Sequence, residues 1–391
     1  MSLKKSVINN LVKVQCFNHM YTKHRVTKHL SFFMTAEEIE KANIDPEYKR
    51  KVVSEYLSRW PERFRDDVRM ADKLLSNAPC FAEAKDKDTI KEELLFYRVG
   101  YGFHPEEYVC YELADKNSEE RSSYISSKEC VRDVFRMNDY RYSHVLNNKG
   151  LSYKRFKQYY KRDAVYIQSP DDYAAYSDFI RKHPVFVKKN VFEAMGRSVE
   201  LIDVNKTEGT DKEVFNKLIQ IGPHLLEEKV TQSDVLASLH PSSVNTIRCI
   251  TFLTRHGIED PYYFMKIGQA GAFVDNGGAG GILVGIDKET GRLCTNGYDE
   301  MNREYTEHPD TKVVFKGYQL PEWEQLKVLC KKISEELSEV KYIGWDMAHT
   351  DAGWVVIEGN GAGQMIGPQT VFKRGCKPEV DAFMADMDLI V

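Results

Sequence analysis

The chain has 391 residues, of which 42% are hydrophobic and 12% aromatic, so it is long enough and apolar enough for two or three globular domains or one large elaborated domain. Its formal net charge of −4 argues against a general nucleic-acid binder, and no uninterrupted apolar run approaches the roughly 18 residues of a membrane span. Eight cysteines are scattered without a C-x-x-C pair, which favours reduced thiols of the cytoplasm over disulfides or a zinc site. No secretory signal peptide is recognisable at the start.

The first 34 residues form the most biased segment of the chain. They carry six Lys or Arg, three His and no acidic residue, with apolar residues at near-helical spacing. This pattern predicts an amphipathic helix, which could make weak contact with the inner face of an anionic membrane. The alternative is a helix that packs on its own domain, which is the commoner arrangement.

The segment that follows reads as a series of helices. Thr35 and Glu38 form a capping box that begins a helix running to about residue 42, and Pro46 suits the first residue of the next helix. A third helix is predicted over about 62–76, and the helical pattern continues to about residue 135 around a Gly/His/Pro loop at 100–105. We therefore expect a mainly helical N-terminal region over 1–135.

From about residue 164 the pattern changes to short runs rich in β-branched residues. The runs "AVYIQ", "PVFVKKN", "SVELIDV" and "HLLEEKV" predict strands, separated by helices over 171–182 and 212–221. A second block contains strands in "NTIRCITFLTRHG" and "PYYFMKIGQAG" around a turn at 257–261, then a hairpin turning at 287–291. Pro321 begins an amphipathic helix that leads into two last strands, 342–349 and 353–360. The fold class is α+β, with two α+β units after the helical region.

The last hairpin contains two acidic residues among large apolar side chains. If it closes tightly at 351–353, residues whose numbers sum to about 704 lie opposite one another, so Asp346 faces Glu358. Asn360 then lies on the same face as Glu358, and apolar neighbours on both faces predict a sheet that is covered on both sides.

Two carboxylates at such a distance repel one another, so one is protonated or a cation lies between them. No Lys or Arg of the hairpin can neutralise them, and two carboxylates with one amide suit Mg²⁺. The alternative is an acid pair that reaches solvent at the sheet edge. For a metal site we expect Asp346→Asn and Glu358→Gln to abolish turnover with the fold intact, and even to stabilise the metal-free protein.

Fixed cations that could meet nucleotide phosphates stand elsewhere in the chain. Lys188 ends an apolar strand, although a lysine at the end of a strand is more commonly a solvated surface residue. Arg248 begins another apolar strand, where it needs an anion, either the acids of the hairpin or a phosphate. No G-x-x-x-x-G-K-[ST] motif is present, which argues against a P-loop.

Several of these motifs together resemble the ATP-grasp superfamily. They are Lys188, "LLEEKV", "VNTIRCITF", "DNGGAGG", "HPDTK", "LPEWEQ" and "GWDMAHTDAGWVVIEGN". Over about residues 145–372 the chain is most similar to the sugar-transfer-associated ATP-grasp family, found beside bacterial surface-polysaccharide genes. The resemblance implies two α+β subdomains that grip ATP, over 136–230 and 231–391.

The resemblance also implies a role for individual residues. Asp346, Glu358 and Asn360 would bind Mg²⁺, which Mn²⁺ could replace, and Lys149 and Lys188 would contact the ATP phosphates. Adenine would lie against Glu227, Glu228 and Val230, and the ribose against Gln232 or Asp234, under a loop containing Gly196, Arg197 and Ser198. Arg248 would stabilise the transferring phosphoryl group, Asn276 would lie near the acceptor, and Lys266 stands where the family often has arginine.

The leading functional hypothesis is an ATP-dependent carboxylate–amine ligase that acts through an acyl phosphate. By family context it would join an amino acid or amine to a sugar acid or amino sugar, free or lipid-linked, of a surface glycan. One alternative is a kinase of the same fold that phosphorylates a hydroxyl group. Another is a non-catalytic nucleotide-binding scaffold of a glycan assembly complex.

Overall fold

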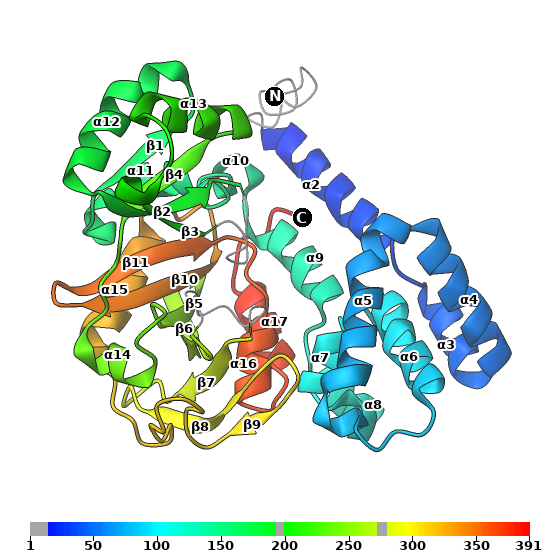
Figure 1. Cartoon of the computed structure of the whole chain (residues 1–391). Coiled ribbons are helices and arrows are strands. Elements are labelled where there is room, and N and C mark those ends of the chain that lie inside the picture. Colours follow the sequence, from blue (N-terminus) through cyan, green and yellow to red (C-terminus); the bar gives the residue numbers. More distant parts are fainter. Residues whose placement is uncertain (1–14, 193–198, 272–279) are drawn as a thin grey trace.

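A computed structural model describes residues 15–192, 199–271 and 280–391 of the chain. A group of helices formed by the first third of the chain lies beside a larger part that contains two β-sheets (Figure 1). Among the described residues, no helix is long and apolar enough to cross a membrane. No disulfide joins the seven cysteines whose side chains are described.

The predicted helical region is confirmed. Its main helices are α2 (Gln15–Leu30), α3 (Ala36–Ile44), α4 (Pro46–Arg59), α5 (Pro61–Asn77), α6 (Lys87–Phe96), α7 (Pro105–Cys110), α8 (Ser118–Ser122) and α9 (Ser127–Met137). The capping box of Thr35 and Glu38 begins α3, and Pro46 is the first residue of α4. Apolar side chains of α3 to α7 form their own core.

The described part of the basic N-terminal segment packs on the protein itself. In α2, Asn18 and Thr22 are buried, and the guanidinium of Arg25 lies 3.9 Å from the ring centroid of Phe135 in α9. Asn18 donates a hydrogen bond to Asp139. Residues 15–30 therefore follow the second of the two alternatives, a helix packed on its own domain, and residues 1–14 lie outside the described part.

The smaller sheet has four strands in the order β1-β4-β2-β3. Its strands are β1 (Ala164–Ile167), β2 (Val185–Asn190), β3 (Glu200–Asp203) and β4 (His224–Glu228), with α12 (Tyr173–Lys182) and α13 (Asp211–Ile221) between them. One face packs on these two helices. The opposite face, represented by Leu225, shares a core with the larger sheet and with α11 (Lys149–Tyr160).

The larger sheet has seven strands in the order β11-β10-β5-β6-β7-β8-β9. They are β5 (Thr246–Thr254), β6 (Gly257–Ile267), β7 (Ile282–Ile286), β8 (Leu293–Tyr298), β9 (Glu304–Tyr305), β10 (Tyr342–Thr350) and β11 (Gly353–Asn360). The remaining helices are α10 (Tyr140–Ser143), α14 (Asp234–Leu239), α15 (Trp323–Glu335), α16 (Ile366–Val371) and α17 (Lys377–Ala385).

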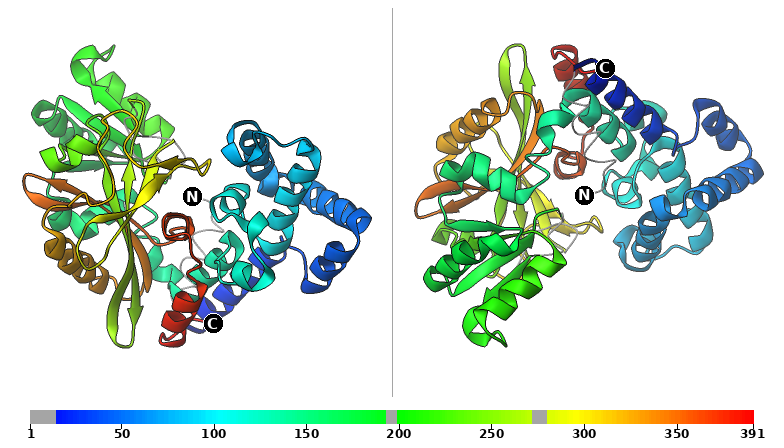
Figure 2. Two further views of the ribbon diagram at one scale, coloured as in Figure 1. Left: turned by 90° about the horizontal axis from the view of Figure 1, so that it is seen from below. Right: turned by 90° about the horizontal axis from the view of Figure 1, so that it is seen from above.

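Helices cover both faces of the larger sheet, as the sequence predicts. The face that carries Trp345 packs on α11 and α15, and the face that carries Tyr342 packs on α9, α16 and α17. Figure 2 shows α16 and α17, in red, between the larger sheet and the N-terminal helices. Although α9 falls within the predicted 1–135 region, its buried side chains belong to the core of this sheet.

Two predicted boundaries are wrong. The turn expected at 257–261 lies between Thr254 and Gly257, and β6 continues through Pro261. Pro261 is tolerated within β6 because the β5–β6 pairing is irregular at this point, where a residue without an N–H group breaks no hydrogen bond of the ladder. The helix expected from Pro321 begins at Trp323, since Glu322 has a left-handed backbone with φ 45°.

Candidate active site

The two acids of the last hairpin lie opposite one another as predicted. Asp346 of β10 pairs with Glu358 of β11, and Gly344 pairs with Asn360. The pairs nearer the turn, such as Thr350 with Gly353, sum to 703, one less than at the two acids. A β-bulge between the two parts of the ladder restores the register that brings the acids together.

The negative charge of Asp346 is neutralised by two cations from neighbouring strands. Its carboxylate is 1% exposed and accepts hydrogen bonds from Arg248 Nε at 2.6 Å and Nη2 at 2.9 Å. Lys266 Nζ lies 3.2 Å from its Oδ2. The hairpin alone contains no such cation, because Arg248 comes from β5 and Lys266 from β6, one and two strands away.

The charges of this cluster shift the pKa values of its members. Burial alone would raise the pKa of Asp346, but the nearby Arg248 and Lys266 outweigh it and lower that pKa to about 2. Burial likewise works against the charge on Arg248, and the Asp346 carboxylate keeps the pKa of the guanidinium above its ordinary value. Both groups are therefore ionised at neutral pH.

Glu358 and Asn360 complete the polar group on this face. Asn360 Nδ2 lies 3.4 Å from an oxygen of Asp346 and 3.4 Å from an oxygen of Glu358. The Glu358 side chain is 34% exposed, and Lys149 Nζ, at the start of α11, lies 3.7 Å from its Oε2. Asp346 thus forms the closed end of the cluster and Glu358 its open end.

The donor chemistry of this cluster fits Mg²⁺. Because an amide can turn by 180°, Asn360 can present Oδ1 to the space between the carboxylates, giving an all-oxygen set. Neighbouring ligands of Mg²⁺ in an octahedron lie about 3 Å apart, close to the observed 3.4 Å spacing. No group of three His, Cys, Asp or Glu suited to a metal occurs in the described ranges, so a metal site with three protein ligands here would need the amide as its third donor.

Two glycines make room for this arrangement. A Cβ atom at Gly344 would lie 3.1 Å from Cδ of Arg248, so the guanidinium crosses β10 where that strand has no side chain. A Cβ atom at Gly359 would lie 2.6 Å from Cζ3 of Trp345 on the other face. At both positions an added Cβ atom would lie closer to its neighbour than ordinary van der Waals contact permits.

The structure places two neighbouring lysines of β2 on opposite faces of the smaller sheet. Lys188 lies opposite Leu226, on the face covered by α12 and α13, and its Nζ is 2.8 Å from Glu200. Lys189 lies opposite Leu225, on the face toward the larger sheet, and its Nζ is 2.9 Å from Glu227. The phosphate contact of Lys188 stays a prediction, and Lys189 is a second candidate. The alternation of faces along "VFVKKN" is the sequence signal that separates the two lysines.

The residues predicted to contact adenine lie at the end of β4 and differ in burial. The Glu227 carboxylate is buried and binds Arg162 and Lys189, which lower its pKa against the opposing effect of burial. Glu228 accepts a hydrogen bond from the backbone N–H of Asp163, and Val230 is partly buried just after β4.

The two candidates for the ribose contact, Gln232 and Asp234, differ in their surroundings. The Gln232 amide donates to the carbonyls of His240 and Ser243 and accepts the N–H of Asn245, so it holds its own loop. Asp234 is exposed at the first turn of α14. Gly196, Arg197, Ser198 and Asn276 lie outside the described residues.

Comparisons with known proteins identify the fold. The family model described as sugar-transfer associated ATP-grasp matches residues 134–385, well over half of the chain. No curated protein matches.

Solved structures of ATP-grasp ligases are similar at a low level. The ligase PsnB complexed with a minimal precursor is 12% identical with a TM-score of 0.40, and the match covers 64% of each chain. D-alanyl-alanine synthetase A from Vibrio cholerae is 10% identical with a TM-score of 0.40, over 63% of this chain and 67% of that one. A Chryseobacterium gregarium RiPP-associated ATP-grasp ligase, in complex with ADP and a leader and core peptide, is 13% identical with a TM-score of 0.37, over 65% and 64%.

The chain thus spans less than two thirds of the length of PsnB, and similarity at this level assigns no site by itself. The family model covers both sheets and the face that carries Asp346, Glu358 and Asn360. The chain belongs to the sugar-transfer associated ATP-grasp family.

Proposed function

We propose that the protein is an Mg²⁺- and ATP-dependent carboxylate–amine ligase that acts through an acyl phosphate. The observation that carries this proposal is one face of the larger sheet, where Asp346, Glu358 and Asn360 stand beside Arg248 and Lys266. It combines oxygen ligands for a divalent ion with fixed cations for phosphate, in a site partly shielded from water.

Each group on this face has a separate task. Glu358 and Asn360, at the open end, would hold Mg²⁺ together with Asp346, and the ion would offset the charge of the nucleotide phosphates. Arg248 and Lys266 would stabilise the negative charge that develops on the transferring phosphoryl group. Asp346 keeps both cations in place before the nucleotide arrives.

The smaller sheet would hold the rest of the nucleotide. Lys189 faces the larger sheet, and Lys149 lies beside Glu358, so these two lysines are the proposed phosphate contacts. The Glu227 carboxylate is already engaged by Arg162, which leaves the backbone at 228–230 to read the edge of adenine. The ribose contacts at Gln232 or Asp234 stay a prediction.

The chemistry requires no nucleophilic side chain. A substrate carboxylate oxygen attacks the γ-phosphorus of ATP, giving an acyl phosphate and ADP. An amine nitrogen then attacks the acyl carbon and displaces phosphate, and the amide forms with loss of a proton from the nitrogen. The protein contributes position and electrostatic stabilisation. The family association suggests that a sugar acid or amino sugar and an amino acid or amine are the two substrates, which is an argument from analogy.

The test is to identify the products in a screen of amino acids and amines against uronic acids and amino sugars. A ligase releases ADP and free phosphate only when both co-substrates are present, and forms an amide detectable by mass spectrometry. Phosphate retained on a hydroxyl acceptor would show a kinase instead. Binding of Mg²⁺-ATP without turnover for any substrate pair of the screen would favour the non-catalytic nucleotide-binding scaffold.

The two neighbouring lysines provide a matched test of the nucleotide site. Lys189→Met should raise the KM for ATP by about tenfold or more, since a charge-assisted phosphate contact contributes about 1.5–3 kcal/mol. Lys188→Met, on the opposite face, should leave the KM within about twofold of the wild type. A larger effect at Lys188 than at Lys189 would contradict the proposed placement of ATP.

A further inference from the structure

The position of Glu358 depends on one extra residue in β11. Val356 pairs with Met347, but the next pair joins Asp346 with Glu358, so Ile357 is the unpaired residue of a β-bulge. If the ladder continued without the bulge, Ile357 would oppose Asp346, and Glu358 would oppose Trp345. Glu358 would then lie on the apolar face that packs on α11 and α15. The bulge therefore decides which face carries the second acid.

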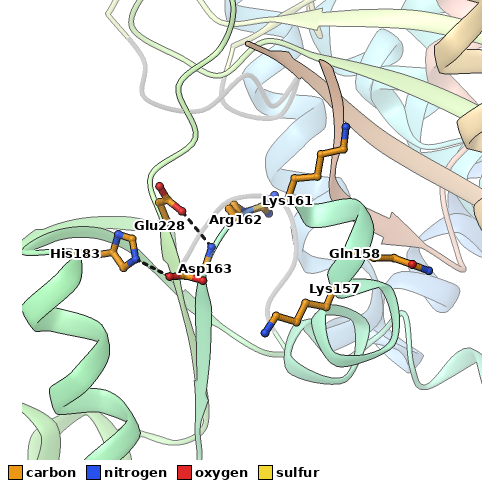
Figure 3. A pocket seen from close by; sticks show the side chains of 7 residues that line it. All are labelled: Lys157, Gln158, Lys161, Arg162, Asp163, His183 and Glu228. Carbon is orange, nitrogen blue, oxygen red and sulfur yellow. Dashed lines mark hydrogen bonds and ion pairs between the residues drawn. The ribbon is translucent and has the colours of Figure 1, made fainter. Parts of the chain in front are cut away.

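The backbone at the bulge is bound by a buried arginine. Arg162 Nη1 donates to the carbonyl of Val356 at 2.7 Å and to the carbonyl of Tyr160 at 3.3 Å. Its side chain is 5% exposed. Figure 3 shows Arg162 between the end of α11 and the start of β1, beside Asp163, which binds His183 and Glu228.

The same arginine binds the smaller sheet. Its Nε and Nη2 donate to Glu227 Oε2 of β4 at 3.1 and 2.9 Å, and Lys189 of β2 donates to the same oxygen at 2.9 Å. One guanidinium thus joins the strand that carries the proposed metal ligand to the strands that carry the proposed phosphate lysine. These contacts are buried, so each is made at low dielectric and is costly to break.

We propose that Arg162 is a positioning residue that fixes the β11 bulge and thereby holds Glu358 and Asn360 on the face of Asp346. Through Glu227 it also fixes the distance between this face and Lys189. The part of this inference that concerns metal and nucleotide rests on the proposed function. The part that concerns the bulge stands on the contacts of Arg162 alone.

The chain offers suitable variants. Arg162→Lys keeps a charge for Glu227 but cannot donate in two directions as the guanidinium does. Arg162→Met removes the charge and leaves Glu227 paired with Lys189 alone. Arg155→Met is the control for the loss of an arginine, because Arg155 of α11 is exposed and donates to a backbone carbonyl at Glu336.

The first measurement is hydrogen exchange in the ligand-free protein. Amides of residues 354–360 should exchange at least tenfold faster in Arg162→Lys and Arg162→Met than in the wild type, and Arg155→Met should match the wild type. Unchanged exchange in a folded Arg162→Lys protein would overturn the role of Arg162 at the bulge. Because Arg162→Lys retains the buried charge, it provides the answer if Arg162→Met does not fold.

The second measurement is Mn²⁺ binding in the presence of ADP, followed by electron paramagnetic resonance. Arg162→Lys and Glu358→Gln should each weaken Mn²⁺ binding at least tenfold. The loss of Mn²⁺ affinity in the double variant should be clearly smaller than the product of the two single losses, because the part of the Arg162 effect that acts through the Glu358 carboxylate is then already gone. If Arg162 acted only on overall stability, the fold losses of Mn²⁺ affinity in the two single variants would multiply in the double variant. Such an outcome would overturn the inference.

The two measurements separate the inference from the proposed function. If the wild type does not bind Mn²⁺ and ADP, the proposed function fails, and the positioning role for metal fails with it. The exchange experiment still decides whether Arg162 fixes the bulge. If the wild type binds Mn²⁺ and ADP and the folded Arg162 variants bind equally well, only the inference is overturned.

Discussion

Asp346 and its two cations form a buried ionic group whose members depend on one another. The carboxylate is held by Arg248 and Lys266, and all three side chains are largely shielded from water. Removing one partner of such a group leaves an uncompensated buried charge. The expectation that Asp346→Asn stabilises the metal-free protein is therefore wrong on this geometry, because the repulsion it would relieve is already offset.

Asp346→Asn should instead lower the free energy of unfolding by about 3–5 kcal/mol, the usual cost of breaking a buried ion pair from one side. Glu358→Gln should change it by less than about 1 kcal/mol, since Glu358 is partly exposed and its lysine is 3.7 Å away. Urea unfolding at neutral pH of both variants tests this difference. Equal stability of Asp346→Asn and the wild type would contradict the ion-pair description.

Glu107 is another buried acid, in the helical region and apart from the site. Its carboxylate closes the capping box of α7 by accepting the N–H of His104 at 2.7 Å, and accepts the N–H of Ser127 at 3.2 Å. Burial is the main cause that raises its pKa to about 7. Because the folded-state pKa is raised, the stability that Glu107 contributes is fully present below about pH 4.3 and is lost as pH rises through 7.

Glu107→Gln should therefore remove part of the pH dependence of folding. Between pH 5 and pH 8 the wild type should lose roughly 2–3 kcal/mol of unfolding free energy that the variant keeps, by the linkage between pKa and stability. Urea unfolding at both pH values measures it. Glu120→Gln is the control, since Glu120 closes the capping box of α8 in the same way but is exposed. Parallel pH profiles for the wild type and Glu107→Gln would refute the assignment.

At the scale of elements, the β10–β11 hairpin places polar and apolar side chains on opposite faces of one sheet. Trp345 packs against Phe156 of α11 and donates to Ser334 of α15, so its ring fills the space beneath Gly359. The residue between the two proposed ligands Glu358 and Asn360 has therefore to be small. The tight packing behind the hairpin keeps the charges in front of it in fixed positions.

Gly359→Ala should disturb the hairpin, because the added Cβ would lie 2.6 Å from Trp345 and 2.9 Å from Leu146. Overpacking of this kind costs about 1–3 kcal/mol of unfolding free energy. It should also weaken Mn²⁺ binding in the presence of ADP, since residues 358 and 360 move with the backbone. Gly361→Ala, whose nearest atom is at 3.3 Å, is the milder control. If both variants behave alike, the packing of Trp345 does not restrict the hairpin.

At the scale of the whole molecule, the two sheets and α11 share one core. A nucleotide that contacts Lys189 and Glu358 together would bind both sheets at once. Such a ligand binds the folded protein and has no comparable site in the unfolded chain. Its binding must therefore raise the apparent stability of the entire two-sheet part.

Mg²⁺-ADP at about 100 times its dissociation constant should stabilise the protein by about 2.7 kcal/mol. Thermal unfolding with and without EDTA measures this effect, which should disappear when the metal is removed. Glu358→Gln should show little of the shift although its own fold is intact. A shift that survives EDTA and the Glu358 substitution would place the nucleotide away from this cluster.

Much of the fold could be predicted from the sequence because its signals are local. The capping box at Thr35, the proline at the start of α4 and the alternating strands each depend on residues a few positions apart. The pairing of the strands β10 and β11 belongs to the same class, since a short turn joins them, but the opposition of Asp346 and Glu358 also depends on the β11 bulge. The family resemblance rests on these same strands, and the family match confirms it.

Tertiary structure decided what the local patterns leave open. Arg248 and Lys266 reach Asp346 from two other strands, Lys189 rather than Lys188 faces the larger sheet, and the β11 bulge moves Glu358 onto the polar face. Arg162 binds that bulge from 194 positions earlier in the chain. The sequence by itself determined which residues are acidic, basic and extended. Which of them neutralise one another depends on strand order and on the face each strand presents, because charges interact through space and not along the chain.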